Sequence, residues 1–306
     1  MEVGIVTYDK GNSFFNCLYS LQRDGFDPIV VCTHPFNDIP DRAKNLRIIH
    51  LPENPGYGKA INAILSEIHD HCLIVNDDIM IPKDQISILE EELERTKHPC
   101  VLQPKLDFGN GEIENYGHDL WIDAFNSARF RGWESSSIPR SNPTVFSGAA
   151  FVIHRDVVKE VGPFSEDLIF YGEEVDYTLR MFQKNLYVKG SEATFIHGYG
   201  ESLGEVYNEK IYLIERNRQK ILQRLYPKSC SYNSILGALF RKKQFPSLDS
   251  SKMLPALLGI LSGMRYGYRR QLSRKNHIHS TNYLSHQNNR LTYSQLWALF
   301  QKQNRL

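Results

Sequence analysis

The chain has 306 residues, of which 41% are hydrophobic and 11% aromatic, a composition that supports a large folded core and excludes an intrinsically disordered protein. Its net charge of +1 hides a strong asymmetry. Residues 1–215 contain 19 Lys and Arg against 34 Asp and Glu, whereas residues 216–306 contain 17 against a single acid, Asp249. A basic segment after an acidic body predicts an anionic partner for that segment.

The cysteine pattern predicts reduced thiols. No spacing resembles CxxC, which argues against a zinc site, and an odd number of scattered cysteines argues against a disulfide framework. The first residues run straight into a predicted strand without a basic leader, so we expect no secretory signal and a cytoplasmic location. The cysteines are Cys17, Cys32, Cys72, Cys100 and Cys230.

The first 82 residues alternate between predicted strands and helices about 25 residues apart. This β-α-β-α-β order is typical of a parallel sheet covered by helices, and we expect an α/β fold of the Rossmann-like type. Ligands of such sheets bind at the carboxyl ends of the strands. The predicted strands cover residues 3–7, 28–32, 46–51 and 72–76.

An acidic triplet follows the fourth predicted strand. Asn76, Asp77 and Asp78 end an apolar run that has the character of a buried strand, so they should lie where the strand leaves the sheet. Three oxygen-bearing side chains there suit a hard cation such as Mg2+ or Mn2+. An acidic turn that caps the next helix, which starts near Asp84, explains the triplet equally well.

Two common nucleotide motifs are absent. The sequence contains neither GxGxxG nor GxxxxGK[ST], which argues against NAD-dependent and P-loop enzymes. Residues 54–58 contain only a GxG, which predicts a tight turn that opens a helix.

Residues 107–142 follow a predicted strand at 101–106 and are irregular in pattern. A loop region of this length is either a substrate lid or a structural insertion with a short hairpin. A strand predicted over residues 145–153 has Gly148 and Ala149 in its middle. Their small size permits either close approach of a sugar or tight packing.

Three acids start another predicted helix. Glu173, Glu174 and Asp176 are crowded enough for one carboxylate to act as a general base, although acids are also common simply as favourable charges in a first helical turn. Arg180 lies one turn after Asp176 and is expected to pair with it. A last strand ends at His197, where a metal or phosphate role competes with a structural one.

The C-terminal region changes character after a charged helix predicted over residues 208–226. Apolar runs at 235–240 and 253–264 are too short to span a bilayer, and Lys and Arg clusters follow each of them. This pattern favours interfacial helices on an anionic membrane over a helical subdomain packed on the body. We expect a domain at 1–226, a basic, partly amphipathic helical region at 227–306, and no nucleic-acid partner.

Taken together, these segments resemble the family 2 glycosyltransferases of the GT-A fold, particularly rhamnosyl- and galactofuranosyltransferase-like members. No single match is specific, but all occur in the family's order over about residues 3–226. The matching segments are 4–8, 54–58 with Asn62, 75–78, 147–153, 161–164, and 171–176 with Arg180 and His197.

The resemblance implies a nucleotide-diphosphate sugar donor, a divalent cation (Mg2+ or Mn2+) and inverting transfer to a glycan or lipid-linked glycan. Asp78, Asn76 and His197 match metal-binding positions, His197 one that contacts either the metal or the diphosphate. Glu174 matches the general base, with Glu173 and Asp176 beside it. The expected donor site is lined by Thr7, Tyr8, Asp38, Asn54, Gly56, Gly58, Asn62, Asn76, Asp77, Gly148 and Ala149.

Three positions depart from the family pattern. Residues 31–38 lack the usual base-reading Asp, for which Asp38 is the candidate substitute; Asn76 is a neutral ligand; and Glu174 stands where Asp is usual. The leading hypothesis is a peripheral membrane glycosyltransferase of polysaccharide biosynthesis on the cytoplasmic face. The alternatives are a catalytically degenerate glycan-binding scaffold and, with less support, a sugar nucleotidyltransferase, whose Gly-rich Arg/Lys loop is absent.

Overall fold

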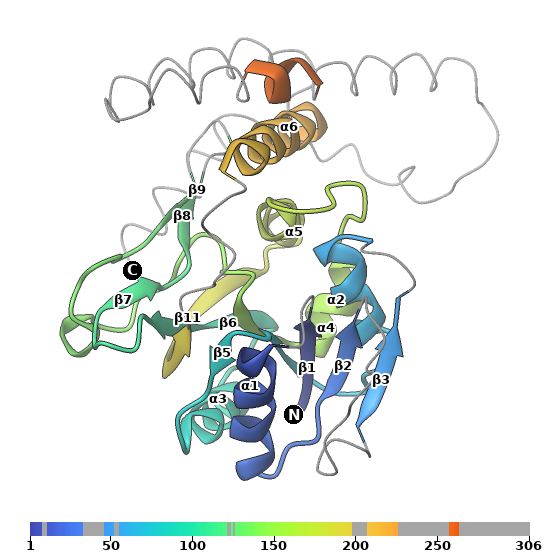
Figure 1. The fold of residues 1–306 in the computed structure, drawn as a ribbon. Coiled ribbons are helices and arrows are strands. Elements are labelled where there is room, and N and C mark those ends of the chain that lie inside the picture. Colours follow the sequence, from blue (N-terminus) through green and yellow to red (C-terminus); the bar gives the residue numbers. More distant parts are fainter. Residues whose placement is uncertain are drawn as a thin grey trace. The chain divides into compact units, whose positions relative to one another are not determined.

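The computed structural model describes residues 1–7, 11–32, 46–51, 55–120, 124, 126–197, 207–225 and 257–262 (Figure 1). The chain divides into two compact units, Met1–Leu120 with Asn126–Glu201, and Trp121–Phe125 with Ser202–Leu306. The elements of unit 1 are β1 (Glu2–Thr7), α1 (Asn12–Arg23), β2 (Ile29–Cys32), β3 (Arg47–His50), α2 (Tyr57–Leu65), β4 (Cys72–Asn76), β5 (Ile79–Met80), α3 (Gln85–Glu94), β6 (Cys100–Asp107), β7 (Ile113–Asn115), β8 (His118–Leu120), β9 (Asn126–Ala128), a 3-10 turn (Ser135–Ser137), β10 (Ala150–Ile153), α4 (Arg155–Val161), α5 (Glu173–Phe182) and β11 (Tyr187–His197).

The described part of unit 1 is built on one twisted sheet with strand order β3-β2-β1-β4-β10-β6-β11-β5. β3, β2, β1, β4, β6 and β11 all run in one direction, because β10 is antiparallel to both β4 and β6. β5 and β7 also run against their neighbours β11 and β6. The predicted α/β fold with a mostly parallel sheet is confirmed.

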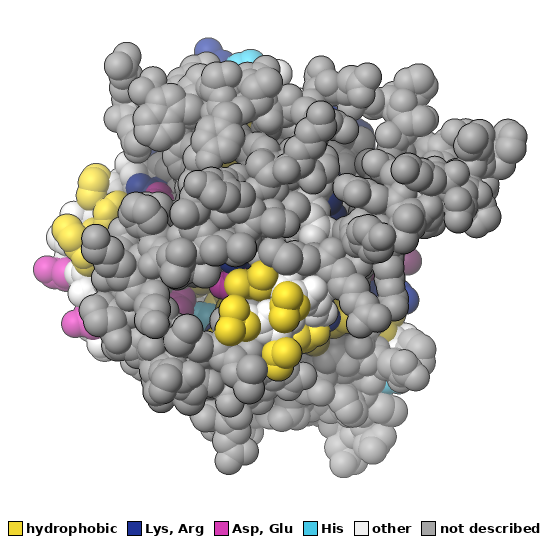
Figure 2. All heavy atoms as spheres, turned by 90° about the horizontal axis from the view of Figure 1, so that it is seen from above, with side chains coloured by type: hydrophobic (Ala, Val, Ile, Leu, Met, Phe, Trp, Pro, Cys, Tyr) yellow, Lys and Arg dark blue, Asp and Glu magenta, His cyan; other side chains and the backbone are white. Residues whose placement is uncertain are grey.

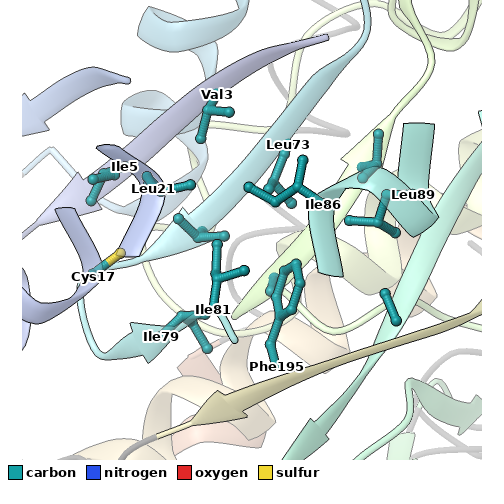
Figure 3. Close-up of a cluster of buried hydrophobic side chains, with 14 of the residues drawn as sticks. Val3, Ile5, Cys17, Leu21, Leu73, Ile79, Ile81, Ile86, Leu89 and Phe195 are labelled. Carbon is teal, nitrogen blue, oxygen red and sulfur yellow. The ribbon is translucent and has the colours of Figure 1, made fainter. Parts of the chain in front are cut away.

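Helices cover both faces of this sheet because its buried strands are apolar on both sides. One face packs against α1 and α3, and Figure 3 shows side chains of these helices meeting Val3, Leu73 and Phe195 of the strands. The other face packs against α2, α4 and α5, with Ile64 and Tyr177 among the buried residues. The strand ends are thereby held rigidly at one edge.

The structure corrects three local predictions. The strand expected over 145–153 is formed only by Ala150–Ile153, because the chain turns at Gly148 and Ala149. The segment 107–142 is not irregular throughout: it contains β7 and the antiparallel pair of β8 and β9, as the hairpin alternative expects. Asp84 precedes α3 but its side chain makes no capping hydrogen bond.

The described residues of unit 2 include α6 (Tyr207–Leu225), which agrees with the predicted helix, and a helical turn at 257–262. The Tyr212 hydroxyl donates a hydrogen bond to Ser262 Oγ at 3.0 Å. A Cβ atom at Gly259 would lie 2.5 Å from the Tyr212 carbonyl oxygen, so glycine allows this turn to lie directly on α6. Among the helices described, none combines the length and the apolar character needed to cross a bilayer.

Cys17, Cys32, Cys72 and Cys100 are buried free thiols, as expected; Cys230 lies outside the described residues.

Two neighbouring histidine rings, His71 and His154, lie at the start of α4, with centroids 4.0 Å apart and planes tilted by 36°. His71 Nδ1 accepts the backbone N–H of Arg155 at 3.2 Å, and His154 Nδ1 accepts that of Asp156 at 3.1 Å. Both rings therefore act as acceptors for otherwise unpaired N–H groups of the helix. Burial lowers the pKa of His154, and the neighbouring His71 and Lys159 lower it further against the opposing charges of Asp156 and Asp70.

This arrangement predicts a loss of stability in mild acid. The folded protein binds a proton at His154 less tightly than the unfolded chain does, so the stabilisation is present above about pH 6.5 and is lost as the pH falls. His154→Asn keeps a capping acceptor but cannot titrate. The free energy of unfolding, measured with urea at pH 7.5 and at pH 5.5, should change less with pH in the variant than in the wild type. An equal change in both proteins would contradict the prediction.

Candidate functional site

The ends of β1 and β4 form the centre of the candidate site. The two strands pair in parallel with Val6 opposite Asn76, so the residues that follow leave the sheet side by side. Thr7 is buried, and its Oγ1 donates a hydrogen bond of 2.6 Å to Asp77 Oδ2. The predicted gathering of Thr7 and Asp77 at the carboxyl edge is therefore seen in the structure.

Asn76 Oδ1 is buried at this edge without a hydrogen-bond partner among the described residues, and Asp78 Oδ1, also buried, faces the His197 ring. The backbone N–H of Asn76 donates to the Ala149 carbonyl at 2.9 Å, which extends the contact of β4 with the segment before β10. Buried carboxylate and amide oxygens are costly when unpaired, and in native proteins they mark sites that bind something.

His197 lies beside Asp78 because β11 pairs with β5, with His197 opposite Ile79. Its Nε2 is 3.3 Å from Asp78 Oδ1, and its Nδ1 is 3.2 Å from Glu114 Oε2. Burial acts to lower the pKa of His197, but the two carboxylates outweigh it and raise the pKa to about 9. The sequence pattern gave no indication of Glu114, which comes from β7.

Tyr57, the first residue of α2, connects this edge to the start of α5. Its hydroxyl donates a hydrogen bond to the Gly148 carbonyl, and a Cβ atom at Gly148 would lie 3.3 Å from the Tyr57 ring. Burial raises the pKa of Tyr57 well above its usual value, and the charges of Glu173, Glu174, Asp78 and Asp77, in that order, raise it further. Carboxylates of both acidic clusters thus lie near enough to the half-buried Tyr57 to raise its pKa.

Two glycines of the segment before and within α2 permit a close contact with residues 164–169. Gly56 has φ 93° and ψ 159°, a conformation almost restricted to glycine, and a Cβ atom there would collide with the Ile169 backbone. A Cβ atom at Gly58 would lie 2.8 Å from the Ser165 carbonyl oxygen. The N–H of Tyr57 donates to the Ile169 carbonyl at 2.7 Å, so these glycines fix the position of Tyr57.

Asn62 secures the same contact from the next turn of α2. Its Oδ1 accepts the backbone N–H of Phe164 at 2.8 Å, while its Nδ2 donates to the Phe164 carbonyl at 3.0 Å and to Glu166 at 3.1 Å. The donor-binding role expected for Asn62 stays a prediction, and its observed contacts are with this loop.

Glu174 stands in the first turn of α5, partly buried, and Asn126 Nδ2 of β9 donates to its Oε1 at 3.1 Å. Burial raises its pKa, against hydrogen bonds from the backbone and from Asn126 that lower it. A carboxylate with a raised pKa is a stronger base near neutral pH.

The other two acids of α5 are more deeply buried than Glu174. Glu173 is 2% exposed, and Asp176 is 4% exposed. Asp176 Oδ2 accepts hydrogen bonds from Ser165 Oγ at 2.6 Å and from Arg180 Nε at 3.0 Å, so the expected pairing with Arg180 is present. These contacts hold α5 against the preceding loop, and the catalytic roles suggested for Glu173 and Asp176 stay predictions.

The donor atoms fit a divalent cation in part. In the described part of the chain, no three His, Cys, Asp or Glu side chains converge as a complete metal cage. Asn76 nevertheless offers an unpartnered buried oxygen and Asp78 a buried oxygen that faces His197, and hard cations complete their coordination with water and substrate phosphates. The 3.3 Å between Asp78 Oδ1 and His197 Nε2 is close to the roughly 3 Å between neighbouring ligands of an octahedral ion.

The structure brings together most of the predicted residues that it describes. Thr7, Asp77, Asp78, Asn76, Ala149 and His197 are linked at the strand edge. Gly148 accepts the hydrogen bond of Tyr57, and the charge of Glu174 raises the pKa of Tyr57. Tyr8, Asp38 and Asn54 lie outside the described residues. Sequence reasoning missed Tyr57, Glu114 and Asn126. Only Tyr57 carried a signal, as an aromatic residue between two glycines at a helix start.

Comparison with known proteins supports the fold. No protein family and no curated protein matches the sequence. Among solved structures, the chain is similar to the mannosyltransferase PcManGT from Pyrobaculum calidifontis in complex with GDP-Man and Mn2+, with TM-score 0.51, 9% identity and 88% of each chain covered. A weaker similarity, with TM-score 0.44 and 11% identity, links 73% of this chain to 97% of the inositol-1-phosphate CTP transferase from T. maritima. At 9% identity the similarity to PcManGT shows a shared GT-A-like fold alone.

The contact of Gly56 with Ile169 predicts a specific cost of substitution. Gly56→Ala should lower the free energy of unfolding by at least about 1 kcal/mol more than Gly25→Ala does, because overpacking adds to backbone strain. Gly25 is the matched control, since it has φ 86° but nothing within 4 Å of its Cβ position. Chemical denaturation measures both variants; equal losses would show that the Ile169 contact is not tight.

Proposed function

We propose that the protein is a metal-dependent, inverting glycosyltransferase that moves a sugar from a nucleotide-diphosphate donor to a hydroxyl group of a glycan. One observation supports this most strongly: Asp78, a candidate metal ligand after β4, and the candidate base Glu174 both lie close enough to the half-buried Tyr57 for their charges to raise its pKa. A transferase needs both groups in one site, one for the leaving diphosphate and one for the acceptor hydroxyl. The fold shared with a mannosyltransferase that was solved with GDP-Man and Mn2+ agrees with this assignment.

A cation is required by the charge of the site. A diphosphate is anionic, and it would approach four carboxylates unfavourably without positive charge to accompany it. Asp78, Asn76 and His197 would hold the cation, with Thr7 keeping Asp77 in place beside them. When bound, Mg2+ or Mn2+ neutralises the charge that develops on the departing diphosphate.

Glu174 is assigned the base role at the other end of the reaction. Its raised pKa lets it accept the proton of the acceptor hydroxyl as that oxygen attacks the anomeric carbon. Asn126 holds Oε1 from one side, and this leaves the carboxylate oriented while the acceptor approaches. Glu is one methylene longer than Asp, and its side chain therefore has more conformational freedom. The hydrogen bond from Asn126 limits that additional freedom.

We also propose that the acceptor is lipid-linked and that unit 2 binds the cytoplasmic face of an anionic membrane. Leu257, Leu258 and Leu261 are 51%, 50% and 61% exposed, whereas Ile260 between them is 6% exposed. Figure 2 shows a group of hydrophobic side chains exposed on the face seen from above. Residues 216–306 add 17 Lys and Arg against one acid, which complements anionic headgroups around such an apolar face.

A sugar nucleotidyltransferase ranks below this proposal because residues 4–10 lack a Gly-rich loop bearing Arg or Lys. That activity would require binding of a nucleoside triphosphate together with a sugar phosphate. A degenerate scaffold would bind no nucleotide in a metal-dependent manner.

The donor site predicts metal-dependent nucleotide binding. In a thermal-shift screen of UDP, GDP, dTDP, ADP and CDP, one diphosphate should raise the melting temperature only when Mn2+ is present. At 100 times its dissociation constant a ligand stabilises by about 2.7 kcal/mol, which such a screen detects. Glu174→Gln should retain this shift but lose release of the diphosphate from the matching nucleotide sugar in the presence of acceptor glycans.

Two outcomes would count against the proposal. Stabilisation by triphosphates with sugar phosphates, and not by diphosphates, would favour the nucleotidyltransferase, and no shift with any nucleotide would favour the scaffold. Near-normal release by Glu174→Gln would remove Glu174 from the base role alone.

The membrane proposal predicts that the three exposed leucines contribute most of the apolar binding energy. Replacing Leu257, Leu258 and Leu261 together with Ser should weaken binding to vesicles of equal parts phosphatidylcholine and phosphatidylglycerol by at least about tenfold. Tyr19→Ser, at an exposed aromatic residue of α1, serves as the control. Co-sedimentation of the full chain measures both, and undiminished binding of the triple variant would show that the leucines do not contact the membrane.

A further inference from the structure

Glu114 joins the candidate site from a segment with no sequence motif. It lies on β7, where its neighbours Ile113 and Asn115 are buried and Glu114 itself is partly exposed. Ile113 packs with Tyr116 and Ile138 in a small core of its own. The alternation of side chains along a strand therefore directs Glu114 to the opposite face from that core.

Each oxygen of the Glu114 carboxylate has a separate partner. Oε2 is 3.2 Å from His197 Nδ1, and Oε1 accepts a hydrogen bond of 3.2 Å from Arg131 Nη1. The Arg131 guanidinium in turn lies over the Phe108 ring, 5.1 Å from its centroid. Glu114 is thus held from one side by Arg131 and holds His197 on the other.

The backbone of His197 is already fixed by the pairing of β11 with β5. The remaining freedom is the rotation of the imidazole ring, which decides whether Nε2 or the carbon Cε1 faces Asp78. An acceptor at Nδ1 resolves this choice, because a hydrogen bond at one ring nitrogen determines the role of the other.

We propose that Glu114 is a positioning residue that orients the His197 ring so that Nε2 faces Asp78 and the bound donor. This inference rests on the proposed function for the identity of the donor, but the orientation of the ring does not depend on it. Glu114 itself touches neither the donor nor the acceptor in this proposal.

The first test is the metal dependence of nucleotide binding. Glu114→Ala should raise the Mn2+ concentration needed for the diphosphate-induced thermal shift by about 10- to 100-fold, the usual cost of losing a group that orients a metal ligand. Glu114→Gln, whose amide oxygen can still accept from Nδ1–H, should recover much of this loss. Glu112→Ala is the control, because Glu112 lies on the same segment with an exposed side chain. An unchanged Mn2+ requirement in Glu114→Ala would overturn the proposal.

The second test reads the ring directly and without nucleotide. In wild-type protein with 15N-labelled histidine, the His197 signals, assigned with His197→Gln, should show a hydrogen-bonded Nδ1 proton. Glu114→Ala should abolish that signature, while Glu112→Ala should not. If the signature is the same in Glu114→Ala, the proposal fails. If wild-type protein binds no nucleotide, the proposed function fails while this spectrum still decides the role of Glu114. Should Glu114→Ala not fold, Glu114→Met, which fills similar space but has no acceptor oxygen, takes its place, and a spectrum identical to wild type at Nδ1 would overturn the proposal.

Discussion

The parallel pairing of β1 with β4 is the constraint on which the candidate site depends. It sets Val6 opposite Asn76 and so delivers Thr7 and Asp77 to the same point of the sheet edge. The Thr7 hydroxyl satisfies one carboxylate there, and Asp78 is left facing His197. The two acids in the short turn between β4 and β5 thus have different partners in consecutive positions, Thr7 for Asp77 and His197 for Asp78.

The second physical feature is the concentration of negative charge. The charges of Glu173, Glu174, Asp78 and Asp77 all disfavour ionisation of Tyr57. Its hydroxyl therefore stays protonated and donates a hydrogen bond to the Gly148 carbonyl. Partly buried carboxylates that gather at one site repel one another. A bound cation relieves that repulsion, whereas a pocket without charge has no such repulsion to relieve. The acidic character of the edge is therefore an argument for the cation that is independent of any likeness to other proteins.

Much of this arrangement could be predicted from the sequence, because it follows from local patterns. Apolar runs that end in polar residues predicted the positions of β1 and β4. Acids that follow a glycine predicted the start of α5. Glu114 and Asn126 could not be found in this way. Their strands have three residues each, too short for a period-2 pattern, and the partner of a strand is not encoded in its own residues. The start of β10 was missed for a related reason, since an apolar run does not show where a turn at Gly148 ends and strand pairing begins.

The same short segment supports both ends of the proposed reaction. β7 brings Glu114 to His197 at the leaving-group side, and β9 brings Asn126 to Glu174 at the acceptor side. β7 and β9 belong to two antiparallel pairs, β6–β7 and β8–β9. A displacement of β7 would therefore disturb the histidine, and a displacement of β9 would disturb the proposed base. These strands are better understood as supports for the two proposed reacting groups than as a passive insertion, and both substrates would meet side chains whose orientation the strands set.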